Sequence, residues 1–79
     1  MKILNEALER ERRRKSLPGP IERRLFRMQA GLTQQDVAAC LKLSRAAISR
    51  YESGDRAPRG KTLDRYLDVL GKLSDAKSA

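Results

Sequence analysis

The chain has 79 residues, and its 18 Lys or Arg against 10 Asp or Glu give a net charge of +8. A chain of this length has room for only one domain and for no deep catalytic cavity. It has no histidine and a single cysteine, which excludes an intrachain disulfide and histidine-ligated metal sites, and we expect no metal or other cofactor. No apolar run approaches the roughly 20 residues of a membrane span or resembles a signal peptide, so we expect a cytoplasmic protein. Its positive charge is expected to attract nucleic acid, an anionic membrane surface or an acidic protein.

The first predicted element is a charged helix or loose arm over residues 3–15. Its narrow apolar stripe comprises Ile3, Leu4, Ala7 and Leu8. A run of mixed charge follows and ends in Arg12-Arg13-Arg14-Lys15. This run fits two interpretations, a solvated helix end or a basic arm that follows a nucleic-acid backbone or enters a minor groove.

Two prolines predict a boundary in Ser16-Leu17-Pro18-Gly19-Pro20, because proline restricts its own φ angle and that of the residue before it. Pro20 also suits the first turn of a following helix. We therefore divide the chain into a basic N-terminal helix or arm with its linker (1–19), a folded domain (20–73) and a polar C-terminal tail (74–79).

The first core helix is predicted to begin near Ile21 and to stop at Gly31. Ile21, Leu25 and Met28 recur every three to four residues, so we expect them to face the core.

A short second helix is predicted after Thr33, whose hydroxyl would cap it with Asp36 in the first turn. Its inward face is expected to carry Val37, Ala38 and Leu41. Cys40 is expected to be a small packed or half-buried residue.

A third helix is predicted from the cap Ser44 to about Ser53, with Ala47, Ile48 and Tyr51 on its buried side. The basic loop 56–60 precedes a fourth amphipathic helix. Its apolar positions are Leu63, Tyr66, Leu67, Leu70 and Leu73. We expect this stripe to be core, although part of it could form a two-fold dimer contact.

The second and third helices are close enough in sequence to cross steeply. Such a crossing requires a small residue on the first helix, and Ala38 meets that need. Ile48 would fill the wedge between the two helices. The opposite, exposed face of the third helix would then carry Arg45, Ala46, Ser49 and Arg50.

Residues 21–70 resemble the helix-turn-helix domain of the phage repressor (Cro/C1-type, or Xre) family. The resemblance rests on Leu32-Thr33-Gln34-Gln35-Asp36-Val37-Ala38, on Leu43-Ser44-Arg45-Ala46-Ala47-Ile48-Ser49-Arg50-Tyr51-Glu52-Ser53-Gly54, and on Pro58 followed by Thr62-Leu63. It implies a compact all-α, four- to five-helix, lambda-repressor-like domain whose third helix enters the DNA major groove. One departure is Lys42, which stands where the family usually has glycine.

The resemblance implies that Arg45, Ala46 and Arg50 read DNA bases. Arginine can donate a bidentate fork to guanine O6 and N7, and a methyl group of Ala46 or Ala47 can contact thymine. The residues expected at DNA phosphates are Thr33, Gln34, Lys42, Ser44, Ser49, Arg56, Arg59 and Lys61. The hydroxyls of Ser44 and Ser49 could instead cap a helix or make no contact. The resemblance also pairs Arg27 with Glu52 in a structural ion pair.

An enzyme is not expected, because the chain lacks a Gly-x-x-x-x-Gly-Lys phosphate loop and an evident pair of carboxylates in a cleft. A membrane-surface helix is not expected either, because the residue 3–8 stripe lacks aromatic anchors. The rival hypothesis is a protein-interaction adaptor or antitoxin-like module that captures a partner protein with its N-terminal helix.

We therefore expect a sequence-specific, double-stranded DNA-binding regulator, a repressor or phage-type regulator in the nucleoid of a bacterial or phage-infected cell. Two copies one helical turn apart, about 34–36 Å, would read a pseudo-palindromic operator as a homodimer.

Overall fold

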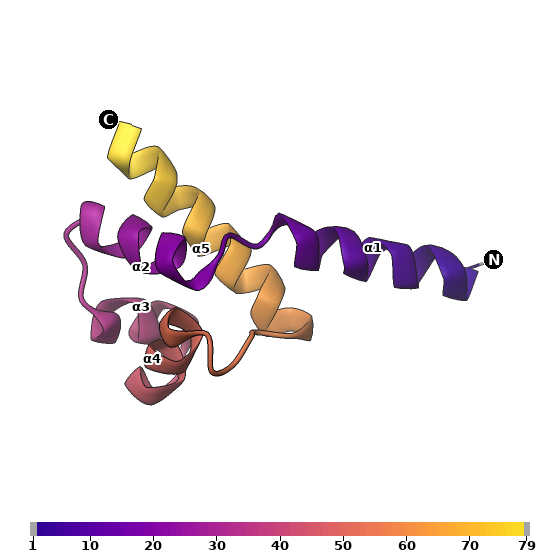
Figure 1. The fold of residues 1–79 in the computed structure, drawn as a ribbon, viewed down its shortest axis with the longest axis horizontal. Coiled ribbons are helices and arrows are strands. Elements are labelled where there is room, and N and C mark those ends of the chain that lie inside the picture. Colours follow the sequence, from indigo (N-terminus) through magenta and orange to yellow (C-terminus); the bar gives the residue numbers. More distant parts are fainter. Residues whose placement is uncertain (1, 79) are drawn as a thin grey trace.

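Five helices make up the fold of the described residues, and the predicted all-α class is confirmed. The computed structural model describes residues 2–78, with side chains through residue 75, and contains no strand within that range. The helices are α1 (Lys2–Ser16), α2 (Pro20–Gln29), α3 (Gln34–Leu41), α4 (Arg45–Ser53) and α5 (Gly60–Ser78). Helices α2 to α5 form the body, and α1 projects from it as a single helix (Figure 1).

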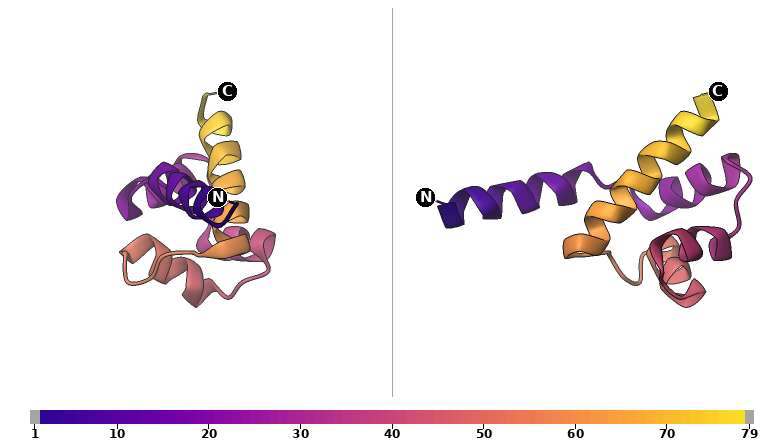
Figure 2. Two further views of the ribbon diagram at one scale, coloured as in Figure 1. Left: turned by 90° about the vertical axis from the view of Figure 1, so that its right-hand side faces the viewer. Right: turned by 180° about the vertical axis from the view of Figure 1, so that it is seen from behind.

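The core lies between α5 and the α3–α4 pair, with α2 packed against both α4 and α5 (Figures 1 and 2). Its buried apolar side chains are Val37, Ala38, Leu41, Ile48, Tyr51, Tyr66, Leu70 and Leu73. Ala38 and Ile48 are fully buried, which confirms their predicted orientation. On α5, four of the five predicted positions, Leu63, Tyr66, Leu70 and Leu73, are buried in this chain, whereas Leu67 is half-buried.

The predicted inward face of α2 was wrong. Ile21, Leu25 and Met28 are 76%, 46% and 52% exposed. The residues that turn inward instead are Arg23, Phe26, Arg27 and Ala30. Both arginines bury their alkyl stems and satisfy their guanidinium groups with hydrogen bonds. Buried arginines are rare, so the prediction placed the apolar residues of α2 toward the core and its arginines toward solvent. The structure has the opposite orientation.

Arg23 ties three segments together and is 7% exposed. Its Nε donates to the carbonyl oxygen of Pro18 at 2.7 Å, and its Nη1 donates to that of Tyr51 at 2.8 Å. The Tyr51 carbonyl lies in the last turn of α4, where helix carbonyls lack a helical partner. Arg23 therefore fixes the linker and the start of α2 against the end of α4.

Cys40 is exposed, so its predicted packing was also wrong. Helix α3 directs Val37, Ala38 and Leu41 inward. At about 100° per residue, the side chain at position 40 then points well away from that face.

Helix α1 is a helix throughout, not a loose arm, and none of its residues is buried. Only its last part meets the body: Arg13 Nε lies 2.9 Å from Asp64 Oδ1 on α5. Leu17, which follows α1, packs against the core. At the other end of the chain, α5 continues through Ser78, so the segment expected as a polar tail extends the last helix.

Lys42 ends α3 in the left-handed conformation, at φ 56° and ψ 43°. We predict that Lys42→Gly raises the free energy of unfolding by about 0.5–1 kcal/mol, because relief of a strain of roughly 1–2 kcal/mol exceeds the added freedom of the unfolded chain. Chemical denaturation measures the change. Lys42→Ala is the matched control, since it removes the charge but keeps the strained Cβ. An equal gain in both variants would show that backbone strain is not the cause.

Candidate nucleic-acid interface

The α3–α4 pair is held by its caps and its short turn. The Thr33 hydroxyl accepts from the N–H of Asp36 at 3.1 Å, and the Asp36 carboxylate accepts from the N–H of Thr33 at 2.8 Å. The hydrogen bond from the Thr33 N–H to the Asp36 carboxylate lowers the pKa of Asp36. The Ser44 hydroxyl caps α4 by accepting from the N–H of Ala47 at 3.1 Å. With Ala38 at the crossing and Ile48 wedged behind it, the turn fixes which face of α4 meets solvent.

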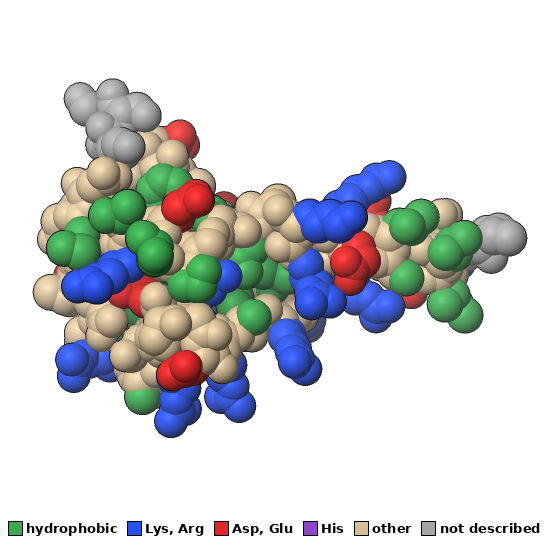
Figure 3. All heavy atoms as spheres, viewed as in Figure 1, with side chains coloured by type: hydrophobic (Ala, Val, Ile, Leu, Met, Phe, Trp, Pro, Cys, Tyr) green, Lys and Arg blue, Asp and Glu red, His purple; other side chains and the backbone are tan. Residues whose placement is uncertain are grey.

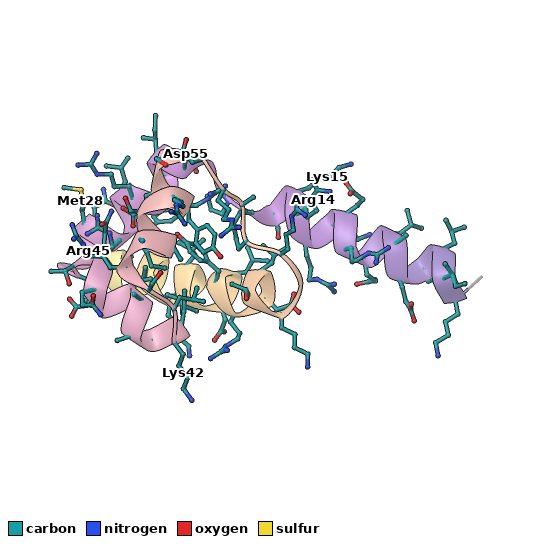
Figure 4. The ribbon with its side chains drawn as sticks, turned by 90° about the horizontal axis from the view of Figure 1, so that it is seen from below. Arg14, Lys15, Met28, Lys42, Arg45 and Asp55 are labelled. Atoms are coloured by element: carbon teal, nitrogen blue, oxygen red, sulfur yellow. The ribbon has the colours of Figure 1, made fainter. Side chains whose placement is uncertain are left out.

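That outer side of α4, here called the reading face, consists of Arg45, Ala46, Ser49 and Arg50, all of them exposed. Ala47 is half-buried. Within the described part of the chain, neither arginine of the reading face is in an ion pair. In the view from below, Arg45 lies beside α4 at the periphery of the body (Figure 4). Both guanidinium groups are therefore free to bind a ligand.

Uncompensated positive charge extends beyond the reading face. We define the basic edge by its members, all exposed and none of them ion-paired among residues 2–75: Lys42, Arg45, Arg50, Arg56, Arg59 and Lys61. Figure 3 shows Lys and Arg side chains along the lower border of the molecule, on the side where Figure 1 places α4. In contrast, Lys72 on α5 pairs with Asp68 at 3.3 Å.

Gln34 occupies a different position from the other predicted phosphate contacts. It is half-buried, and its Nε2 donates to Glu52 Oε1 at 3.2 Å. Gln34 and Gln35 begin α3, and their backbone N–H groups belong to the first turn, where helix donors lack helical acceptors. The start of α3 can therefore offer backbone donors to an anion while the Gln34 side chain supports Glu52.

Arg27 and Glu52 form a bidentate ion pair between α2 and the end of α4. Arg27 Nε donates to Glu52 Oε2 at 2.6 Å, and Arg27 Nη2 donates to Glu52 Oε1 at 2.9 Å. The remaining nitrogen, Nη1, donates to the Leu32 carbonyl oxygen at 2.7 Å. The side chains are only 11% and 4% exposed, and the hydrogen bonds to Glu52 raise the pKa of Arg27. This pair holds α4 from behind the reading face.

Sequence reasoning missed the buried Arg23, and it predicted Tyr66 only as a core residue. Arg23 was overlooked because its neighbours offered a more conventional apolar stripe. Tyr66 was assigned to the core by spacing alone, without its electrostatic surroundings. Burial, aided by the negative charge of Glu52, raises the pKa of Tyr66 to about 12, so the phenol stays neutral. Its ring meets that of Tyr51 edge to face, with centroids 5.4 Å apart.

Some basic side chains of α1 lie in solvent, and others lie against the body. Arg12 pairs with Glu9 at 3.4 Å and Arg14 with Glu11 at 3.1 Å, both in the exposed i, i+3 arrangement of a solvated helix. A cavity of about 370 Å³ nevertheless opens between α1 and the loop before α5. Its lining includes four arginines, Arg10, Arg13, Arg14 and Arg59. Arg13 and Arg14 are in ion pairs, so among residues 2–75 it is Arg10 that continues the basic edge beyond Arg59.

Among the described residues, no helix is long and apolar enough to cross a membrane, and no three potential metal ligands gather into one group.

In comparisons with known proteins, a model of the helix-turn-helix family matches residues 24–75, which include α3, the turn and α4. No curated protein and no solved structure matches the chain.

Proposed function

Because this chain belongs to the Cro/C1-type helix-turn-helix family of DNA-binding regulators, we propose that it binds one DNA sequence specifically by inserting α4 into the major groove. The observation that carries this proposal is the reading face, where Arg45 and Arg50 are exposed and free of carboxylates. Arginine is the side chain best suited to guanine, because its planar fork matches O6 and N7. Ala46 lies between them and can offer its methyl group to thymine.

Contacts to DNA phosphates, which do not depend on the base sequence, would come from the rest of the basic edge and from the start of α3. Lys42, Arg56, Arg59 and Lys61 carry point charges suited to phosphates. The Thr33 and Ser44 hydroxyls already accept backbone hydrogen bonds, so they would contact a phosphate in addition to capping. Ser49 is exposed and its hydroxyl is available. The arginine cavity beside Arg59 supports α1 as a further contact to the DNA backbone.

We propose that the protein acts as a repressor or phage-type regulator and reads a pseudo-palindromic operator as a homodimer. One reading face covers few base pairs, and two copies related by a two-fold axis double the sequence that is read. Selection from random duplexes followed by footprinting tests this directly. The expected result is one enriched sequence with inverted half-sites that contain guanine. An unenriched pool would contradict sequence-specific recognition.

The salt dependence of binding measures the number of phosphates contacted. With about six phosphates neutralised per chain, we predict that log K falls with log salt concentration at a slope near −5. Lys61→Gln should reduce the magnitude of that slope by about 1. Lys72→Gln is the matched control, because Lys72 pairs with Asp68 on α5 and lies outside the basic edge. A slope near zero, or equal changes in the two variants, would contradict the assigned phosphate grip.

A second candidate function is an adaptor whose N-terminal helix binds a partner protein. The specific observation in its favour is that Ile3, Leu4 and Leu8 are 82%, 54% and 48% exposed on a helix with no buried residue. Such a protein would show saturable binding to its partner that Leu8→Asp abolishes while DNA affinity stays unchanged.

A further inference from the structure

Helix α1 carries an apolar stripe that nothing in the described part of this chain covers. The α1 stripe consists of Ile3, Leu4 and Leu8, flanked by the half-buried Ala7. A helix of 15 residues is marginal alone in water, and most helix stability in proteins comes from packing an apolar face. The stripe therefore needs a covering surface if α1 is to be a stable part of the protein.

A second uncovered stripe lies on the outer side of α2. The α2 stripe consists of Ile21, Leu25 and Met28, at i, i+4 and i+7. These three residues are exposed because α2 turns its arginines inward. The α1 stripe spans about one and a half turns of helix and the α2 stripe about two. They lie on elements that are adjacent in the sequence but do not touch through these faces.

The linker prevents α1 from covering the α2 stripe of its own chain. Pro18 and Pro20 restrict the linker, and Arg23 holds the Pro18 carbonyl from inside the body. The ion pair between Arg13 and Asp64 directs the end of α1 toward α5. Figure 1 and the right-hand view of Figure 2 show α1 leading away from the body. The covering surface must therefore come from another molecule.

We propose that the occupant is a second copy of this chain, with the α1 stripe of each copy packed on the α2 stripe of the other. Figure 3 shows hydrophobic side chains over α2 and on α1 on the same face of the molecule. A 180° rotation about an axis that is vertical in that view, on the viewer's side of this face, brings each stripe against its counterpart. The same rotation leaves the lower, basic borders of both copies facing the same way, as binding to one duplex requires.

The area that it covers favours this exchange. After the rotation α1 runs antiparallel to the partner's α2. The exchange covers twelve large apolar side chains, on the order of 1,000 Å² or more, which approaches the roughly 1,200–2,000 Å² of a specific interface. Two α1 stripes packed on each other would cover only half as many.

Sedimentation equilibrium without DNA tests the exchange through two variants, Leu8→Asp on α1 and Leu25→Lys on α2. Both substitutions are at exposed positions, so the folded body should keep its helical circular dichroism. We expect a dimer for the parent and a dissociation constant raised roughly tenfold or more for each variant alone. An equimolar mixture should again dimerise, because one of its two contacts is unchanged and the other places the introduced carboxylate against the introduced ammonium group. Asn5→Lys, exposed on α1 outside the stripe, is the control and should stay dimeric.

Three results would overturn this proposal: a monomeric parent, a mixture that stays monomeric, or a Leu25→Lys variant that dimerises normally while Leu8→Asp does not. The last would indicate pairing of two α1 helices. The inference rests on the proposed binding to a two-fold operator and deepens it, but its assembly is measured without DNA. A dimer that binds no duplex would therefore contradict the proposed function alone, and a monomer that binds a half-site would contradict this inference alone.

Discussion

Arg27→Met is expected to lower the free energy of unfolding by about 3–5 kcal/mol. The substitution removes both arginine nitrogens from Glu52, whose side chain is 4% exposed, and leaves that carboxylate with only the Gln34 amide. The Leu32 carbonyl also loses its donor. Since a small domain has only about 5–15 kcal/mol of stability, the variant should be largely unfolded near physiological temperature. Thermal and urea denaturation followed by circular dichroism measure the loss.

The double variant Arg27→Met with Glu52→Leu tests whether the instability of Arg27→Met comes from the unpaired buried carboxylate of Glu52. Replacing both members of a buried ion pair by apolar residues of similar volume is often neutral or stabilising, so the double variant should recover most of the lost stability. A double variant as unstable as Arg27→Met alone would show that the pair does more than neutralise buried charge. Any loss of DNA affinity in Arg27→Met reports this stability defect, because Arg27 lies behind the reading face.

Arg45→Ala and Arg50→Ala should each weaken binding to the selected operator by roughly 5- to 150-fold, which corresponds to about 1–3 kcal/mol for a bidentate contact to guanine. Both side chains are exposed and free of ion pairs, so the free energy of unfolding should change by less than about 0.5 kcal/mol. The loss should be confined to the cognate sequence. Affinity for unrelated duplexes should fall only slightly, as expected for the removal of one charge.

Arg65→Ala is the matched control, an exposed arginine on α5 outside the reading face and the basic edge. It should leave operator affinity and stability unchanged. Equal losses on cognate and unrelated duplexes would instead assign Arg45 or Arg50 to the backbone. Operator affinity equal to that of the parent in both variants would remove α4 from the interface.

Local sequence rules accounted for much of the α3–α4 unit. The Thr33 and Ser44 caps, the small Ala38 and the buried Ile48 each follow from chemistry within a few residues, and the structure shows all four. The sequence marked Lys42 only as a departure from the glycine that the helix-turn-helix family usually has at this position. Its φ of 56° shows that the turn keeps its geometry with the less suitable residue.

Helix α2 was misjudged because its orientation depends on distant partners. Arg23 is buried against the Tyr51 carbonyl, 28 residues away, and Arg27 against Glu52, 25 residues away. The family resemblance correctly paired Arg27 with Glu52, but no periodicity within α2 reveals either acceptor, and apolar spacing selected the opposite face. The same error concealed the α2 stripe, which became visible only when the structure placed Ile21, Leu25 and Met28 outside. The assignments of individual side chains to bases and phosphates stay predictions.

Substitution of 7-deazaguanine for guanine in the selected half-site tests most directly whether arginines of α4 read guanine in the major groove. This base lacks the N7 acceptor but keeps the Watson–Crick edge. We predict that the parent protein loses affinity for the substituted operator, and that the Arg45→Ala or Arg50→Ala variant responsible for that contact loses nothing further. A parent protein that binds both operators equally would contradict that role of the arginines.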